Sequence, residues 1–297
     1  MPTEDISARF AELDLWPTHD LVQAMLEGQL AAAAAVQSQA ALIARAAEEA
    51  AARLAAPHGR LIYVGAGTSG RIATMDGVEL GPTFDWGGAR VAYLLAGGER
   101  ALLSSVEGAE DDAAAGEAEM RALAPSSVDV VVGVAASGRT PYTVAALRTA
   151  EAAGALTIGF ANNAGTPLLQ AVAHPVLLDT GAEIVAGSTR MKAGTAQKIA
   201  LNSFSTAVMV RLGRVYAGLM VSMRQANRKL QGRAVEMVAA VAQVESSTAR
   251  NALEQADGDI KLAALIALGA TPEQGAASLL AAGGNLRAAI ARANSGT

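Results

Sequence analysis

Five short apolar segments alternate with helical stretches between residues 60 and 180, and this alternation restricts the chain to an α/β fold. The apolar segments, each expected to form a strand, are 60–65, 90–96, 128–134, 155–160 and 175–178. The helical stretches between them are 70–79, 111–123, 141–153 and 167–172. Strands that alternate with helices form a parallel sheet with both faces covered. We therefore expect a three-layer α-β-α sandwich.

The flanking residues predict helices alone. Residues 18–56 are rich in Ala, Leu, Gln and Glu and predict one or two long helices, and 192–212 and 224–243 predict two more. The tail beyond these predicts three or four short helices. The expected domains are an N-terminal helical segment (1–55), an α/β domain with long C-terminal helices (56–245) and a small all-α domain (246–297).

Composition excludes several classes of function. A net charge of −5 without a basic stripe disfavours nucleic acid and anionic membranes as partners. The chain has no cysteine, so disulfides and thiolate chemistry are excluded, and its three histidines lack metal-ligand spacing. The acidic N-terminus is no secretory signal, and no uncharged apolar run reaches the length of about 18 residues that a membrane span needs. We expect a cytoplasmic protein that uses no metal.

The first strand ends in a glycine-rich turn, Gly65-Ala66-Gly67-Thr68-Ser69-Gly70, which matches the dinucleotide pattern G-x-G-x-x-G. A dinucleotide site usually has an acidic residue at the end of the second strand. Here that strand ends in Leu95-Ala96-Gly97-Gly98, and Glu99 follows the glycines. A Walker A site is excluded because no Gly-Lys-Ser/Thr follows. The loop therefore favours a different anion.

Two further turns repeat the theme of small and hydroxyl residues before a helix: Ser137-Gly138-Arg139 and Gly187-Ser188-Thr189-Arg190. Free N–H groups and the positive dipole end of a helix attract anions. An ordinary capped turn explains any one of these loops equally well, but three in one chain favour a phosphate site. Arg139 could bind substrate or pair with an acid, and Lys192 could contact phosphate or only solvate a helix start. The candidate binding residues are Gly67, Thr68, Ser69, Ser137, Gly138, Arg139, Thr140, Ser188, Thr189 and Lys192.

Five segments together resemble the N-acetylmuramic acid 6-phosphate etherase family of the sugar isomerase (SIS) superfamily: GRLIYVGAGTSGR, GVELGPTF, SSVEGAEDD, VVVGVAASGRTPY and GSTRMKAGTAQKIALN. They occur in the family's order, and the resemblance spans about residues 50–295. It implies an SIS fold and a homodimer with sites near the subunit interface. It also implies cleavage of the D-lactyl ether of the phosphosugar, in amino sugar catabolism, without a metal or redox cofactor.

The same resemblance implies two catalytic glutamates. Glu79 is then the acid for the leaving oxygen, and Glu110 is the base at C2 and afterwards for water. Without the family match, the acidic run around Glu110 would predict helix-capping surface acids. The sequence Val78-Glu79-Leu80-Gly81-Pro82 departs from the family's usual Ser-Glu-Cys-Pro, and residues 1–45 fit its usual opening poorly. These departures affect the expected substrate preference.

Two other functions fit an SIS fold. One is a non-catalytic phosphosugar sensor, and the other is an aldose–ketose phosphosugar isomerase, which also moves the C2 proton. A DNA-binding regulator would need a basic helix-turn-helix segment, and residues 1–56 are not basic. The presence of both glutamates favours the etherase.

Overall fold

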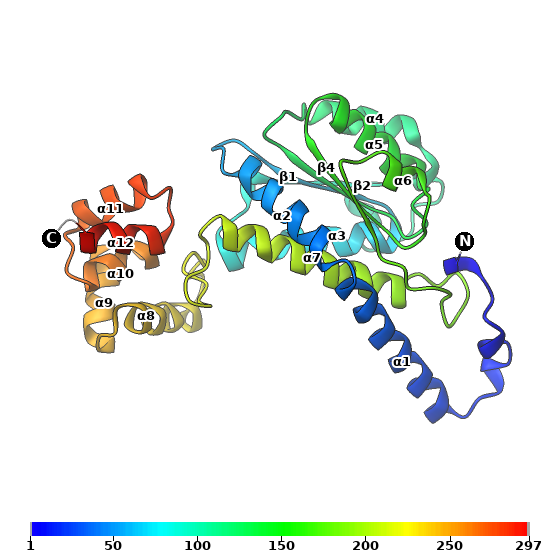
Figure 1. Ribbon diagram of the computed structural model, residues 1–297, viewed down its shortest axis with the longest axis horizontal. Helices are drawn as coiled ribbons and strands as arrows, with labels where there is room; N and C mark the ends of the chain where they lie inside the picture. Colours follow the sequence, from blue (N-terminus) through cyan, green and yellow to red (C-terminus); the bar gives the residue numbers. More distant parts are fainter. Residues whose placement is uncertain (1, 296–297) are drawn as a thin grey trace. The chain divides into compact units, whose positions relative to one another are not determined.

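The structure is a computed structural model that describes residues 2–295 (Figure 1). The chain forms two compact units. The first combines the residues up to Val78 with Ala89–Ala207, and the second combines Glu79–Gly88 with the residues from Val208 onward. The domain limits at residues 55 and 245 stay predictions. The two compact units have other boundaries, but they do not show which part of the chain folds independently.

The first unit is built on a five-stranded parallel sheet in the order β2-β1-β3-β4-β5. Its strands are β1 (Leu61–Gly65), β2 (Val91–Leu95), β3 (Val130–Val134), β4 (Leu156–Ala161) and β5 (His174–Leu177). Every residue of the three central strands is buried. Full burial on both faces explains why these strands read as continuous apolar runs. The five strands confirm the prediction to within one or two residues at each end.

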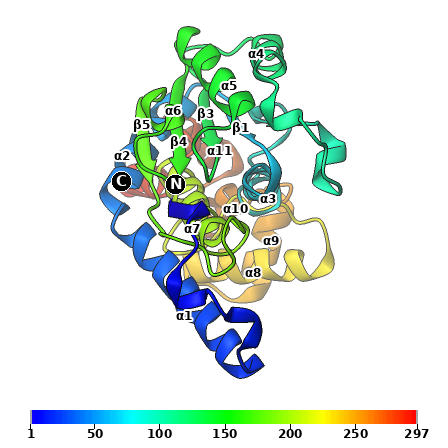
Figure 2. The same ribbon diagram turned by 90° about the vertical axis from the view of Figure 1, so that its right-hand side faces the viewer.

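Helices cover both faces of the sheet, which confirms the α-β-α sandwich (Figure 1 and Figure 2). One face carries α4 (Ala113–Ala122), α5 (Pro141–Ala152) and α6 (Pro167–Gln170). The other carries α2 (Ala40–Leu54), α3 (Gly67–Phe84) and α7 (Lys192–Arg211), while α1 (Thr18–Gln37) extends beyond the sheet. Helix α3 is longer than the predicted 70–79, because Pro82 falls in its last turns and does not end it. Among the described residues, three short 3-10 turns precede α1 (Pro2–Glu4, Ala8–Phe10 and Leu13–Leu15), and three more lie between α3 and α4 (Gly88–Arg90, Glu99–Leu102 and Ala109–Asp111).

The strand order places a switch point between β1 and β3. The chain leaves β1 toward β2 on one side and continues through β3, β4 and β5 on the other. In open α/β sheets, ligands bind outside the carboxyl ends of the strands at such a point, because the two following loops diverge there. The turns after Gly65 and Val134 are therefore adjacent, since these two residues are register partners.

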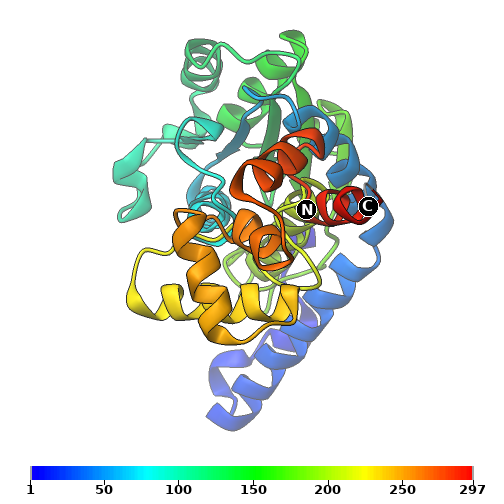
Figure 3. The same ribbon diagram turned by 90° about the vertical axis from the view of Figure 1, so that its left-hand side faces the viewer.

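The second unit contains five helices in its described C-terminal part, drawn from yellow to red in Figure 3. They are α8 (Arg228–Ala242), α9 (Ser246–Gln255), α10 (Ile260–Ala267), α11 (Pro272–Ala281) and α12 (Leu286–Ser295). Small and aliphatic side chains such as Ala234, Val238 and Ala264 form its core. Thr271 and Gln274 form a capping box at the start of α11, as Thr271-Pro272 predicts.

None of the described helices is, by itself, long and apolar enough to cross a bilayer. Helices α1 and α2 pass the test only as a pair bent by 57°, on length and composition alone.

Arg60 and Asp129 form an ion pair at the amino ends of β1 and β3, and this pair stabilises the fold. The Asp129 side chain is 1% exposed and accepts hydrogen bonds from Arg60 N (2.8 Å), Arg60 Nε (3.1 Å) and Ser126 N (2.8 Å). Desolvation acts to raise the pKa of Asp129, but the hydrogen bonds from Arg60 and Ser126 outweigh it and lower the pKa below its usual value.

We expect Asp129→Asn to lower the free energy of unfolding by about 3 kcal/mol, because it leaves the Arg60 charge without its partner. The carboxylate's contribution is complete above its unfolded pKa, near 4, and is lost as pH falls through the lowered folded pKa. Urea unfolding from neutral to acidic pH measures both effects. Glu117→Gln, which removes an exposed pair with Arg121, is the control and should cost less than about 0.5 kcal/mol. Equal effects of the two substitutions would contradict this prediction.

Candidate active site

A cavity of about 320 Å³ lies at the switch point, at the carboxyl ends of β1 and β3. It is lined by Glu4, Ala66, Gly67, Thr68, Ser69, Glu110, Asp111, Ala135, Ala136, Ser137, Arg139, Thr140, Pro141 and Thr189. Most of the predicted binding residues are therefore brought together. Gly138, Ser188, Lys192 and Glu79 are not among the lining residues.

The turn after β1 brings the start of α3 close to the end of the strand. A Cβ on Gly70 would lie 2.8 Å from the carbonyl carbon of Gly65, and a Cβ on Gly65 would lie 2.7 Å from the Cα of Gly70. Gly67 has a φ of +52°, which disfavours other residues. These three glycines satisfy the dinucleotide pattern for steric reasons. Gly67, Thr68 and Ser69 carry the first N–H groups of α3, which have no acceptor within the helix, and all three residues line the cavity.

The turn after β3 supplies a second helix start. Thr140 is the N-cap residue of α5, and Pro141, at the first helical position, suits the start of a helix. Ser137 Oγ accepts a hydrogen bond from Arg139 N at 3.1 Å and so shapes the turn. Gly138 has a φ of +64°, and a Cβ there would meet Thr166 Oγ1 at 2.2 Å. Gly138 therefore makes the turn possible, while its neighbours line the cavity.

The third predicted loop differs from the expectation. The N–H groups of Lys192 and Ala193, at the start of α7, donate to the buried Glu183 carboxylate at 3.0 and 2.9 Å. Lys192 Nζ donates to Thr180 O at 2.7 Å, and the residue is 9% exposed. The protein's own carboxylate thus occupies this helix start, and Lys192 has a structural position. Only Thr189 of this loop reaches the cavity.

The acidic residues before α4 have two different positions. Glu110 and Asp111, in the 3-10 turn Ala109–Asp111, line the cavity. Asp112 caps α4 by accepting a hydrogen bond from Ala115 N at 2.9 Å. The capping interpretation thus holds for Asp112, while Glu110 faces the predicted phosphate-binding turns.

Glu79 lies elsewhere on α3. An α-helix rises 1.5 Å per residue, so Glu79 is roughly 16 Å along the helix axis from Thr68. Its side chain is exposed, and it belongs to the second compact unit. The cavity lining of a single chain therefore includes Glu110 without Glu79.

Sequence reasoning missed Glu4 and Asp111 as lining residues. Asp111 follows Glu110 directly and could have been included with it. Glu4 belongs to an acidic N-terminal stretch with no periodicity and no motif that would have singled it out. Arg139 is the one basic residue of the lining, whereas Glu4, Glu110 and Asp111 are acidic. Neutral N–H and hydroxyl donors must therefore supply much of any anion binding here.

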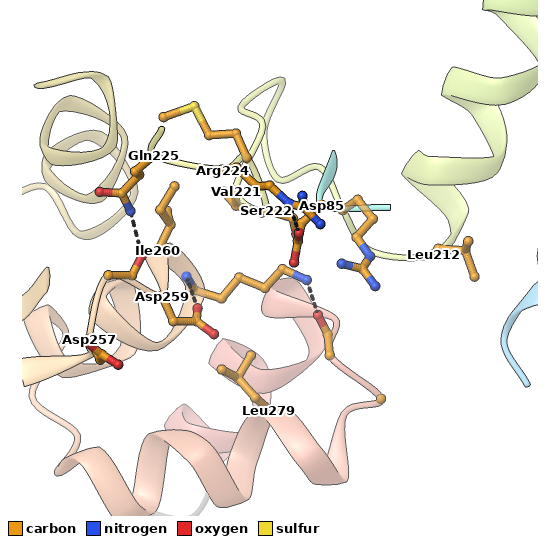
Figure 4. Close-up of a pocket in the computed structure, with 16 residues that line it drawn as sticks. Asp85, Leu212, Val221, Ser222, Arg224, Gln225, Asp257, Asp259, Ile260 and Leu279 are labelled. Atoms are coloured by element: carbon orange, nitrogen blue, oxygen red, sulfur yellow. Dashed lines mark hydrogen bonds and ion pairs between the residues drawn. The ribbon is translucent and has the colours of Figure 1, made fainter. Parts of the chain in front are cut away.

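The second unit has a cavity of about 650 Å³ (Figure 4). Arg224 Nε pairs with Asp85 at 2.5 Å, and Lys261 Nζ donates to Gly284 O at 2.7 Å. Burial, followed by the nearby charge of Arg214, lowers the pKa of Lys261 to about 8. These basic side chains are engaged within the unit, so no substrate role follows from them.

Comparison with known proteins identifies the family. The chain is 49% identical over 286 residues to the N-acetylmuramic acid 6-phosphate etherase of Deinococcus radiodurans, covering 96% of this chain and 93% of the relative. It is 44% identical over 294 residues to the enzyme of the same name from Streptomyces coelicolor, covering 99% and 94% of the two chains. The chain belongs to the N-acetylmuramic acid 6-phosphate etherase family. This confirms the resemblance carried by the five sequence segments.

Two family models match an SIS fold within this etherase family member. The family described as "Glucokinase regulatory protein N-terminal SIS domain" matches residues 42–151, and "SIS domain" matches residues 109–207. Among solved structures, a phosphoheptose isomerase from Francisella tularensis aligns with a TM-score of 0.48 at 14% identity, covering 66% of this chain and all of that one. The phosphoheptose isomerase of Neisseria gonorrhoeae aligns with a TM-score of 0.48 at 16% identity, covering 64% and 97%.

Proposed function

We propose that this protein, as a cytoplasmic homodimer, cleaves the D-lactyl ether of N-acetylmuramic acid 6-phosphate to N-acetylglucosamine 6-phosphate and D-lactate. The observation that carries the proposal is the position of Glu110, which lines the same cavity as the starts of two helices. The cavity can then bind the phosphate of a small substrate and place a proton-transfer carboxylate beside the same molecule. Family membership supports the same activity.

The starts of α3 and α5 hold the phosphate. The orphan N–H groups of α3 and the dipoles of both helices favour a dianion, and the hydroxyls of Thr68, Ser69, Ser137 and Thr140 can donate further hydrogen bonds. Arg139 supplies the positive charge. Because Glu183 closes the start of α7, only two of the three predicted helix starts take part.

Cleavage proceeds through the open-chain sugar. The C1 aldehyde acidifies the C2 proton, and the lactyl oxygen at C3 is beta to the carbonyl. Glu110 takes the C2 proton while Glu79 protonates the leaving oxygen, so that the C3–O bond breaks and a C2–C3 double bond forms. The two carboxyl groups must start in different protonation states.

The product sugar forms by addition of water. Elimination leaves Glu110 protonated and Glu79 ionised. Water then attacks C3 and gives its proton to Glu79, while Glu110 returns a proton to C2, which restores both groups. In this scheme Glu79 takes the proton of the water, whereas the sequence-based prediction gives that step to Glu110; the scheme has the advantage that both glutamates end in their starting states.

Glu79 reaches the cavity of a second copy of the chain. It shares an exposed face of α3 with Met75 and Val78, whose side chains are 44% and 55% exposed. Exposed apolar residues beside a functional carboxylate favour a face that another subunit covers. A site formed by two chains accommodates the roughly 16 Å between Glu79 and the start of its own helix.

Helix α1 supports the same dimer. Val22, Leu26 and Leu30 are spaced four residues apart and are 47%, 56% and 73% exposed, so they form an apolar stripe. In a twofold dimer the same patch of each chain serves the interface. The stripe gives the two copies an apolar surface to bury.

The catalytic assignment predicts the effect of two substitutions. Glu79→Gln and Glu110→Gln should each fold normally and reduce D-lactate release at least about a hundredfold, because each removes one proton-transfer group. Glu107→Gln, an exposed acid in the same run that does not line the cavity, is the matched control and should retain activity. Full activity in either test variant would remove that residue from the mechanism.

The wild-type protein separates the alternative functions. Tight phosphosugar binding without release of D-lactate would favour the sensor, and formation of a ketose phosphate would favour the isomerase.

The dimer assignment predicts a different loss. Leu26→Glu should produce monomers in light scattering and lose most activity, because a charge in the stripe opposes its burial. Leu280→Glu, on α11 at 84% exposure, is the control and should leave both properties unchanged. A fully active Leu26→Glu monomer would rule out a site shared between chains.

A further inference from the structure

The N-terminal 3-10 turn Pro2–Glu4 is held in place by Thr3, a polar residue whose burial the hydrophobic effect does not explain. Thr3 is 0% exposed. Its N–H donates to Asn163 Oδ1 at 3.4 Å, its hydroxyl accepts from Asn163 Nδ2 at 2.9 Å, and its carbonyl accepts from Gly187 N at 3.0 Å. Three hydrogen bonds to two distant loops fix this turn in a single place.

This anchor is tied directly to the cavity. Asn163 is 2% exposed and also donates from Nδ2 to Ala136 O at 2.9 Å. Ala136 lines the cavity, and Gly187 lies two residues before Thr189, which also lines it. The N-terminal turn is therefore positioned by the same loops that form the site.

The next residue, Glu4, lines the cavity. Its carboxylate lies over Gly187, where a Cβ would come within 2.9 Å of Glu4 Oε2. No hydrogen bond or ion pair of this carboxylate is found among residues 2–295. An anchored turn thus places an exposed carboxylate, without a protein partner among these residues, in the lining of a cavity whose other features fit a phosphosugar.

The chemistry of a carboxylate identifies what it meets there. It repels phosphate and strongly accepts hydrogen bonds from hydroxyl and amide N–H groups. We propose that Glu4 is a positioning residue that accepts a hydrogen bond from a hydroxyl or the acetamido N–H of the sugar. It selects sugar phosphates over phosphate alone. This inference rests on the proposed function, and it leaves proton transfer to the two glutamates already assigned.

The test compares two ligands in the full-length protein: the product N-acetylglucosamine 6-phosphate and inorganic phosphate. In Glu4→Gln, the dissociation constant of the sugar phosphate should rise about tenfold, because a charged acceptor is replaced by a neutral one. Binding of inorganic phosphate should stay equal or become tighter, because a like charge is removed. KM should rise by a similar factor, with kcat within about twofold. Glu12→Gln, an exposed acid of the same N-terminal segment, is the control and should match the wild type.

Thr3→Val tests the anchor without changing the cavity lining. It keeps the side-chain shape and removes the hydroxyl that accepts from Asn163. We expect the same selective loss of sugar phosphate binding, and little further loss when it is combined with Glu4→Gln.

Several results would overturn the inference. These are unchanged sugar phosphate binding in Glu4→Gln, equal weakening of both ligands, full additivity of the two substitutions, or a hundredfold fall in kcat at constant KM. The last result would give Glu4 a proton-transfer role. Failure of the proposed function would appear separately, as a wild-type protein that releases no D-lactate, since both ligand titrations can be carried out without turnover.

Discussion

The close approach of Gly65 and Gly70 is the constraint on which the site depends. A side chain at either position would push the strand and the helix apart, because each Cβ would come within 3 Å of backbone atoms of the other. Without side chains at these positions, α3 begins two residues after the end of β1, and its first three residues line the cavity. The neighbouring position of β3 then brings the start of α5 to the same place. Two separate helix starts thereby serve one small cavity.

The same local motif serves two purposes in this chain. At α3 and α5 the helix start belongs to the cavity lining, and we assign it to the substrate phosphate. At α7 the buried Glu183 takes the helix N–H groups, so the protein satisfies them internally. The cavity lining is otherwise rich in acids, which suits proton transfer and recognition of a sugar more than general binding of anions. In the proposed site, phosphate recognition depends on oriented neutral donors, with Arg139 in support.

Much of the fold could be predicted from the sequence, because strands that are buried on both faces of the sheet are continuous apolar segments. Strands such as Val130–Val134 have no polar face to obscure the pattern. The glycine turns and the hydroxyls after β1 and β3 were also predictable, since their positions depend on local backbone geometry. The position of the Lys192 side chain could not be predicted in this way. Its ammonium group donates to Thr180 O, and only the folded chain brings these two groups together. Glu4 was beyond prediction for a similar reason, because a long-range anchor at Asn163 places it.

The central claim is that Glu110 of one chain and Glu79 of another act on one substrate, and mixing two inactive variants tests it most directly. Glu79→Gln and Glu110→Gln chains, mixed in equal amounts and allowed to exchange subunits, form mixed dimers with one site that holds both glutamates. Half of the dimers are mixed and one of their two sites is intact, so D-lactate release should recover to about a quarter of the wild-type rate. If both glutamates act within one chain, the mixture stays as inactive as its components.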